Sequence, residues 1–276
     1  MPKQTLKEAD RELYMIGRRI PFLAVNPRNE WKEKSKFFSS RTYEPQFTYR
    51  PLSLNISSMI SRLESLKINR SYMGQILRHK RDNYISMRRM LEARGSEDFT
   101  ARSLKVYARP NKTLIRKARR ILRYRGEQKK STRLTPKEVA DLLKEALNVY
   151  GFDWKVRQKL MTSDAAVQQS KRTVLVKKGK KFSHDFIRRL IVHEIGTHVL
   201  RYENGMLQPF RVFASGLPGY LETEEGLAVV NEEKAGVLSR HRLRIYAGRA
   251  IAVGKAQESS FREVYSHLKG HFSRET

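Results

Sequence analysis

Apolar residues recur at helical spacing through the first half of the sequence. One stripe, typical of an amphipathic helix, holds Leu6, Ala9, Leu13 and Ile16. Shorter patterns with the same period predict helices near residues 56–68, 84–94 and 112–124. Residues 21–52 lack this period and are rich in proline and aromatic side chains. We expect them to form an irregular segment packed against the body of the protein.

The clearest helix signals lie between residues 131 and 152. Thr135 is a suitable N-cap, Pro136 fits the first helical turn, and Glu138 completes a capping box. Gly151 follows the last apolar position and is expected to end this helix.

After Gly151 the pattern changes from helical to alternating. Residues 152–160 alternate apolar and polar side chains, and Thr173–Val176 is rich in β-branched residues before a glycine turn. Both segments are predicted strands. Arg172–Lys177 is interpreted as an edge strand that can pair with a substrate backbone, or equally as an ordinary structural strand.

A second strong helix pattern follows these strands, with Ser183 as its N-cap and Gly205 placed to end it. Its apolar positions are Phe186, Leu190, Ile191, Ile195 and Val199. A Gly/Pro loop at residues 214–220 leads to a further helix, for which Thr223 is a candidate cap.

These elements predict an α+β protein that is mainly helical. A helical N-terminal part, residues 1–134, is expected to pack on a core formed by residues 135–276, and the two parts can also be read as one continuous domain. The 276 residues are 39% apolar and 31% charged, which suits a globular chain of one large domain or two small ones.

Several classes of protein are excluded by composition. No apolar run approaches the roughly 18 residues that span a bilayer, so no membrane partner is expected, and the charged N-terminus lacks a signal-peptide core. The sequence contains no cysteine, which excludes disulfides and thiolate metal sites. A cytoplasmic location fits these features.

The charge balance is strongly basic, with 57 Lys and Arg residues against 28 Asp and Glu and a formal net charge of +29. It indicates a polyanionic partner (nucleic acid, an acidic membrane surface or an acidic polypeptide), or only a solvated basic surface. The densest run, residues 115–133, is predicted to be an amphipathic helix with a basic face. No zinc finger, glycine-rich phosphate loop or aromatic RNA motif accompanies it, so charge alone identifies no partner.

The helix predicted after Ser183 contains His193, Glu194 and His198. Zinc proteases place two histidines four residues apart on one helix face with a glutamate between them, whereas the spacing here is five. On a regular α-helix, positions five apart lie about 140° apart around the axis. A π-type turn with about 4.4 residues brings them within roughly 50°, and Gly196 inside the interval would ease that distortion.

Two interpretations of this pattern follow from the residues alone. Either a core helix carries two structural histidines, or His193 and His198 bind a metal with Glu194 placed as a general base. A third ligand would then come from downstream, where Glu224 and Glu225 stand near a helix start. Five other histidines are interpreted as non-ligands: His79, His184, His241, His267 and His271.

Residues 193–236, from HEIGTH to TEEGLAVVNEEKAG, closely resemble the tyrosine carboxypeptidase family that includes the microtubule-associated enzyme and bacterial proteins with a Gln-Glu-Gly-Leu-Ala motif. The resemblance extends over most of the chain, to residues 21–38, 44–49 and 242–253. It implies a zincin-like metallopeptidase fold with a small sheet beside the active-site helix.

The resemblance also implies the ligands of one Zn²⁺ per chain: His193, His198 and Glu225. Glu194 is then the general base. Glu224 stands where many bacterial members have glutamine, so it is the weaker candidate for the third ligand. The resemblance favours a helix distorted between the two histidines over two structural histidines.

The implied function is a zinc-dependent carboxypeptidase that hydrolyses a C-terminal Tyr or Phe from a polypeptide, acidic polypeptides included. The alternative is an RNA- or DNA-binding protein with a structural or inactive metal site. Family members usually continue past the HLKGHFSRET end of this sequence, into a segment with Arg-Gly and Lys-Asp motifs. The substrate pocket is therefore expected to be incomplete here, or the chain to be a fragment.

Further substrate-binding residues are expected from the chemistry of a carboxypeptidase. A terminal carboxylate is best held by a bidentate arginine, for which Arg249 and Arg211 are candidates, the alternative being solvated arginines. Tyr220 either steadies the oxyanion or only packs. Asn204 and Gln208 either line the cleft or cap the helix that precedes them.

Overall fold

The computed structural model describes residues 5–52, 56–124, 133–161 and 163–272, which are mainly helical. Packing divides the chain into two units. Unit 1 consists of Met1–Ile20, Ser57–Tyr84 and Lys129–Leu238. Unit 2 consists of Pro21–Ile56, Ile85–Gln128 and Ser239–Thr276. Each unit combines segments from before and after residue 134. The predicted boundary at residue 134 divides the chain by sequence position alone and stays a prediction.

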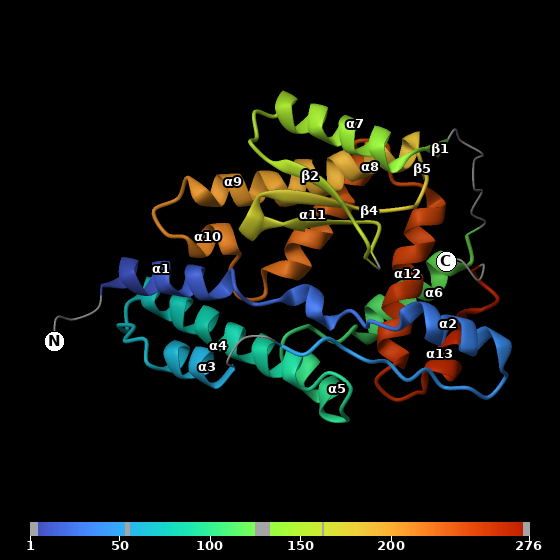
Figure 1. The fold of residues 1–276 in the computed structure, drawn as a ribbon, viewed down its shortest axis with the longest axis horizontal. Helices are drawn as coiled ribbons and strands as arrows, with labels where there is room; N and C mark the ends of the chain where they lie inside the picture. The colour runs from blue at the N-terminus through green and yellow to red at the C-terminus, as the bar shows by residue number, and fades with distance from the viewer. Residues whose placement is uncertain (1–4, 53–55, 125–132, 162, 273–276) are drawn as a thin grey trace. The chain divides into compact units, whose positions relative to one another are not determined.

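Unit 1 contains the helix with the two histidines and both small sheets of the described chain (Figure 1). Its helical elements are α1 (Leu6–Gly17), α3 (Ile56–Glu64), the first part of α4 (Tyr72–Glu92), α7 (Pro136–Val149), η2 (Gln169–Lys171), α8 (His184–Leu190), η3 (Ile191–Val199), α9 (Leu200–Met206), α10 (Val212–Ser215) and α11 (Tyr220–Lys234). Its strands are β1 (Arg133–Leu134), β2 (Lys155–Lys159), β3 (Ala165–Gln168), β4 (Thr173–Lys177) and β5 (Phe182–Ser183).

The capping signals act where the sequence places them. The Thr135 hydroxyl accepts a hydrogen bond from the Glu138 backbone N–H, and the Thr135 backbone N–H donates to the Glu138 carboxylate, so the predicted capping box is confirmed. Ser183 accepts from the Phe186 backbone and caps α8, as predicted. Gly151 has φ of 74° just after α7, a left-handed conformation that glycine adopts at low cost.

The three-stranded sheet has the order β2-β4-β3, with β2 parallel and β3 antiparallel to β4. The prediction of an edge strand at Arg172–Lys177 is therefore wrong, because β4 is hydrogen-bonded on both sides. Burial gives the reason: Thr173–Val176 is a continuous buried run, which is typical of a central strand. The edges are β2 and β3, and β3 packs against η3.

The core of unit 1 lies between this sheet, α7 and the chain of helices α8, η3 and α9 (Figure 1). Its most deeply buried members include Val139, Leu143, Leu147, Val174, Val176, Ile195 and Val199. Ile195 and Val199 belong to η3, so the π-helix is packed into the core along one face while its histidines lie on another.

Two predicted helix boundaries are wrong. Gly205 does not end its helix, because α9 continues to Met206; a Cβ at Gly205 would lie 2.5 Å from the backbone of Ala214. The glycine thus permits close packing of α10 on α9. Thr223 lies inside α11, which begins at Tyr220 after Gly219.

Unit 2 is helical among its described residues. It contains η1 (Phe22–Val25), α2 (Glu30–Ser39), the end of α4, α5 (Asp98–Ser103), α6 (Lys112–Leu122), α12 (Arg240–Lys255) and α13 (Phe261–Leu268). Helices α6 and α12 pack together through Ala118, Leu122, Ala247 and Ile251. The basic run predicted as one helix over 115–133 is helical only to Leu122, where α6 ends, and Arg133 begins β1. Residues 125–132 lie outside the described residues.

Helix α2 corrects the prediction that residues 21–52 are irregular. Its only buried side chains among the described residues are Glu33 and Phe37, so its apolar stripe is too narrow to show a helical period. Acidic side chains in the first turn, Glu30 and Glu33, favour the helix electrostatically.

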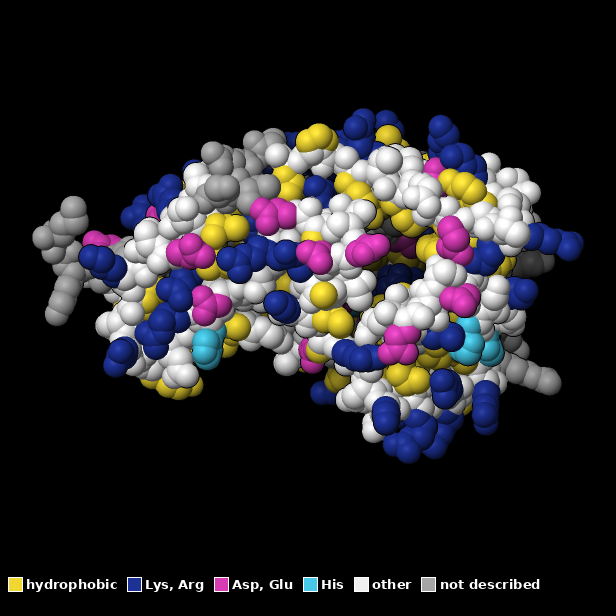
Figure 2. Space-filling view, turned by 90° about the horizontal axis from the view of Figure 1, so that it is seen from below, with side chains coloured by type: hydrophobic (Ala, Val, Ile, Leu, Met, Phe, Trp, Pro, Cys, Tyr) yellow, Lys and Arg dark blue, Asp and Glu magenta, His cyan; other side chains and the backbone are white. Residues whose placement is uncertain are grey.

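The basic surface is not confined to one element. Figure 2 shows dark-blue Lys and Arg side chains spread over the displayed face, with magenta Asp and Glu side chains between them. Among the described residues, no helix is both long enough and apolar enough to cross a membrane.

Candidate metal centre

Helix α8 passes directly into the π-helix η3, Ile191–Val199, which passes directly into α9. The predicted departure from α winding between Ile191 and Val199 is therefore confirmed. The Thr197 hydroxyl donates to the Val192 carbonyl at 3.1 Å and accepts from the Asn231 amide at 3.0 Å. Because Asn231 belongs to α11, the Thr197 hydroxyl links the π-helix to the helix that carries Glu225.

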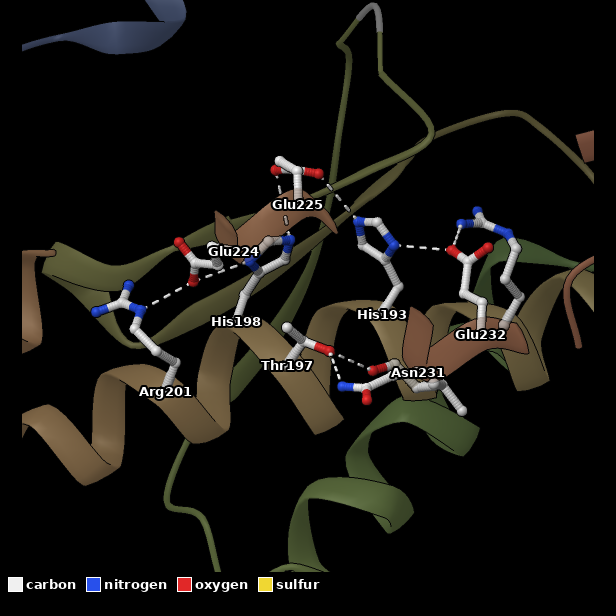
Figure 3. A network of polar contacts seen from close by, with 10 residues as sticks. His193, Thr197, His198, Arg201, Glu224, Glu225, Asn231 and Glu232 are labelled. Carbon is white, nitrogen blue, oxygen red and sulfur yellow. Dashed lines mark hydrogen bonds and ion pairs between the residues drawn. The ribbon is translucent and has the colours of Figure 1, made fainter. Parts of the chain in front are cut away.

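The wider winding brings the two imidazoles together above η3. The ring centroids of His193 and His198 lie 5.0 Å apart, and both side chains are nearly buried. Glu225, from α11, faces both rings: its carboxylate oxygens lie 3.5 Å from His193 Nε2 and 3.6 Å from His198 Nε2 (Figure 3). The three ligand atoms all lie within 4.8 Å of one another.

This donor set fits a zinc ion. Tetrahedral zinc with bonds of about 2.0–2.2 Å separates neighbouring ligand atoms by about 3.3–3.6 Å. The two distances from Glu225 to the imidazoles are of this size, and each is made by a different carboxylate oxygen, Oε2 toward His193 and Oε1 toward His198. Two nitrogens and one carboxylate oxygen are a donor set found in catalytic zinc sites, which keep a fourth position open. The Glu225 side chain is 59% exposed, so the site faces solvent on that side.

Each imidazole is held from behind by a carboxylate of α11. His193 Nδ1 lies 2.8 Å from Glu232 Oε1, which also accepts from Arg189 Nη1 at 2.9 Å. His198 Nδ1 lies 3.0 Å from Glu224 Oε1. A neutral imidazole that donates from Nδ1–H keeps its lone pair on Nε2, and the Nε2 atoms of both rings face Glu225 (Figure 3).

Glu224 therefore contacts the Nδ1 side of His198, whereas Glu225 faces the Nε2 side of the same ring. Glu224 is buried and also accepts from Arg201 Nε at 2.8 Å. Burial raises the pKa of Glu224, but hydrogen bonds and charges from His198 and Arg201 outweigh burial and lower the pKa below its ordinary value.

Arg201 and Lys80 hold α10 and the start of the loop that leads to α11. Arg201 Nη1 donates to the carbonyls of Phe213 and Ala214, and Lys80 Nζ donates to those of Ser215 at 3.1 Å and Gly216 at 2.5 Å. The Tyr220 ring lies 5.4 Å from Lys80 Nζ and 5.2 Å from Arg201 Cζ. Together these contacts fix the start of the helix that carries Glu225.

Glu194 follows the first histidine and is buried on η3. Burial raises the pKa of Glu194 above its ordinary value, while the neighbouring His193 and His198 oppose this rise. A buried carboxylate next to two imidazoles has the surroundings expected of a group that accepts a proton.

The remaining predicted site residues are dispersed. Arg211 Nη1 donates to the Met206 carbonyl at 2.7 Å. Gln208 donates its side-chain amide to the Asn204 carbonyl at 3.3 Å, a capping contact at the end of α9. Arg249 belongs to α12 of unit 2 and is exposed. The substrate roles of these residues and of Tyr220 stay predictions.

Sequence reasoning missed the partners behind the histidines, chiefly Glu232, Arg189, Arg201 and Asn231. A signal for Glu232 was present. It follows Glu225 by seven residues, or two helical turns, and therefore shares a face of α11 with it. The arginines gave no signal, because the sequence contains many of them.

Comparison with known protein families gives a match over most of the chain. A family model described as microtubule-associated tyrosine carboxypeptidase matches residues 35–276. No curated protein and no solved structure matches.

Proposed function

The chain belongs to the microtubule-associated tyrosine carboxypeptidase family, and from this premise we propose that it is a zinc-dependent carboxypeptidase with a zincin-like fold. The proposed reaction releases a C-terminal Tyr or Phe from a polypeptide. The observation that carries the proposal is the convergence of His193, His198 and Glu225 within 4.8 Å, on two helices far apart in sequence.

His193, His198 and Glu225 would hold one Zn²⁺ per chain. When bound, zinc supplies a Lewis acid that polarises a carbonyl and lowers the pKa of a coordinated water to about 7. Glu232 and Glu224 would orient both imidazoles by accepting from Nδ1–H.

Glu194 is the proposed general base. Its carboxylate would take one proton from the attacking water, whose oxygen adds to the scissile carbonyl carbon, and pass it to the peptide nitrogen. The C–N bond then breaks, leaving a carboxylic acid on the shortened chain and a free amine on the released amino acid. Its burial next to the histidines supports this role.

Substrate recognition requires a group that reads the terminal carboxylate. Arg249 and Arg211 are the proposed candidates, Tyr220 is the proposed oxyanion donor, and Asn204 and Gln208 are proposed to line the cleft. Because β3 is an edge strand packed on η3, strand addition by the substrate would use β3 in place of β4.

The family name associates its members with microtubules, and a net charge of +29 suits an acidic polypeptide substrate. The alternative of an RNA- or DNA-binding protein draws no support from the family. We therefore propose the acidic polypeptide as partner.

Cleavage of matched peptides by purified protein tests the proposal. Peptides with a free C-terminal Tyr or Phe should be shortened by one residue, and their C-terminal amides should stay intact. Glu194→Gln should retain about one zinc per chain by metal analysis and lose hydrolysis, because a base is removed and the ligands remain. Internal cleavage of the amidated peptides, or an active Glu194→Gln protein, would refute the proposed reaction.

A further inference from the structure

Unit 2 contains a cavity of about 770 Å³, and Arg249 is the one lining residue for which a role in the peptidase reaction is proposed above. Helices α2, α12 and α13 and the segment at residues 45–47 surround it. Its volume lies within the range of small-molecule sites, about 300–1,000 Å³. None of its lining residues belongs to unit 1.

The wall of this cavity is mainly aromatic. Six lining residues carry aromatic rings: Phe37, Phe38, Phe47, Phe261, Tyr265 and Phe272. Phe37 makes edge contacts with Phe261 and Tyr265, with ring centroids 5.2 and 5.1 Å apart. Phe261 is nevertheless 50% exposed, so apolar surface that a ligand can cover is left open.

Polar clamps hold the aromatic wall in shape. The Arg262 guanidinium lies 4.0 Å from the Phe37 ring centroid and donates to the carbonyls of Phe37, Ser40 and Tyr43 at 2.7–3.1 Å. Buried Glu33 accepts from the Tyr43 hydroxyl at 2.5 Å and the Gln46 backbone at 2.8 Å. These bonds tie α2, the segment after it and α13 together, as expected of a preformed site.

Glycine at position 248 contributes to the same wall. A Cβ there would lie 2.6 Å from the Phe272 ring, so only glycine lets this ring lie against α12. The cavity wall therefore depends on the residue type at this position.

The charged groups at the cavity favour an anion. Lys34, Arg249 and Lys269 line it and are exposed, and their side chains have no hydrogen bond or ion pair with any residue that the structure describes. The two lining carboxylates are both engaged: Glu33 in the clamp above, and Glu30 in a contact of its own. The cations thus remain available to a ligand.

We propose that this cavity binds a small amphipathic anion, with an alkyl body against the aromatic wall and a carboxylate head held by Arg249, Lys34 and Lys269. A medium-chain fatty acid has this chemistry. The cavity exceeds what one terminal aromatic residue needs, and its volume suits an apolar chain. The proposal goes beyond the peptidase reaction and does not depend on it.

Calorimetric titration of the full chain with dodecanoate, below its micelle concentration, tests this site. One dodecanoate should bind per chain, and dodecanol should bind at least about tenfold more weakly, because it lacks the charged head. Arg249→Gln should weaken dodecanoate about tenfold. Arg240→Gln, the same change at an exposed α12 position that does not line the cavity, should bind like wild type.

Blocking the cavity provides the second test. Ala252→Phe places a ring in the cavity from α12 and should abolish binding while the unfolding midpoint stays near wild type; Ala252→Leu serves the same purpose if the larger ring disturbs folding. Glu194→Gln should bind dodecanoate normally, so a failed peptidase assignment leaves this result intact.

Three results would overturn the proposal. The first is equal binding of dodecanol and dodecanoate, and the second is dodecanoate binding that survives in folded Ala252→Phe and Ala252→Leu proteins. The third is displacement of dodecanoate from Glu194→Gln by a peptide ending in free Tyr, since the cavity would then be a substrate subsite. A separate experiment measures binding of the protein to phosphatidylserine vesicles. The Ala252→Phe protein should bind these vesicles as the wild type does. Loss of vesicle binding in Ala252→Phe would identify a membrane lipid as the occupant of the cavity instead.

Discussion

Three carboxylates on α11 contact the two histidines of the candidate metal centre, each in a different way. Glu225 faces the two Nε2 atoms, whereas Glu224 and Glu232 face the Nδ1 atoms of the same rings. The proposed ligand and the proposed positioning residues therefore differ in the direction in which they leave the helix. The adjacent residues Glu224 and Glu225 project about 100° apart around the helix axis. Glu224 can therefore contact Nδ1 of His198 while Glu225 faces Nε2 of the same ring.

Glu232→Gln should weaken zinc binding about 10–100-fold, the usual effect of removing a carboxylate behind a metal-binding histidine. The substitution removes the charge that accepts from His193 and from Arg189. Glu233→Gln is the matched control, because Glu233 is the next residue of α11 and is exposed. Competition with a chromophoric chelator measures the affinities. A destabilised Glu232→Gln protein with wild-type zinc affinity would show that the residue is only structural.

Lys80 links stability to pH. It is 2% exposed, and burial, assisted by the positive charge of Arg201 and opposed by Glu224, lowers its pKa from 10.5 to about 7. Between these two values the unfolded chain binds one more proton than the folded chain, so the free energy of unfolding rises with pH. Below about pH 7 both states are protonated and this contribution has no slope.

Lys80→Met should remove that part of the pH dependence. Urea unfolding of both proteins at intervals from pH 6 to pH 10 measures it, and the wild type should gain stability relative to the variant only above about pH 7. The rings of Tyr84 and Tyr220 can pack on the methionine chain, so the variant is expected to fold. Parallel stability curves across the whole range would contradict the lowered pKa.

At the scale of elements, the π-helix and the α9–α10 pair each contain a glycine, with different consequences. A Cβ at Gly196 would meet Tyr150 Oη at 3.5 Å and the Ile191 carbonyl at 3.7 Å, which are ordinary contacts. A Cβ at Gly205 would meet the Ala214 backbone at 2.5 Å. The first position has room for a methyl group, and the second does not.

Gly205→Ala should therefore lower the free energy of unfolding by about 1–3 kcal/mol, as overpacking does. Gly196→Ala should be neutral or stabilising by up to about 1 kcal/mol, because alanine costs less than glycine in a helix, and should keep its zinc. Chemical denaturation of both variants gives the comparison. Equal losses at the two positions would mean that the close approach of α10 to α9 is not what requires glycine.

Asp10 shows how a distant element sets a helix terminus. Its buried carboxylate accepts from the backbone N–H of Arg211 at 2.5 Å and of Val212 at 2.8 Å. These are the N-cap and first residues of α10, so α1 supplies the anion that the helix start favours. One side chain thus joins α1 to α10, two helices of unit 1 that lie about two hundred residues apart in the sequence.

At the scale of the whole molecule, 57 basic residues against 28 acidic ones should attract acidic substrates and so favour their binding. Peptides with acidic residues upstream of the terminal Tyr should show a lower KM than neutral peptides of equal length. The advantage should shrink as ionic strength rises through 0.15 M, where the Debye length is about 8 Å. Steady-state kinetics on the two peptide series at several salt concentrations measure it.

Nucleic acid provides the control for that prediction. In an active enzyme, RNA should act only as a competing polyanion whose inhibition disappears with salt. RNA binding that stays tight near physiological salt, without any preference for acidic peptides, would overturn this interpretation of the charge and leave the metal centre unaffected.

The sequence alone predicted those features that depend on local chemistry. Caps at Thr135 and Ser183 act through hydrogen bonds within four residues, so their residue types are sufficient to locate them. The histidine spacing left two interpretations open, and together with the family resemblance it predicted the wider winding that the π-helix between Ile191 and Val199 confirms. The family resemblance supplied Glu225 as the residue to meet them.

Only the tertiary structure decided what depends on neighbours distant in the chain. β4 is central because β3, which has no clear strand pattern, pairs with its second side. Gly205 is required by the backbone of α10, and Glu224 is turned from the cluster by Arg201. Local periodicity carries no information about such partners, since pairing and close packing are properties of two segments whose meeting is determined by the whole fold.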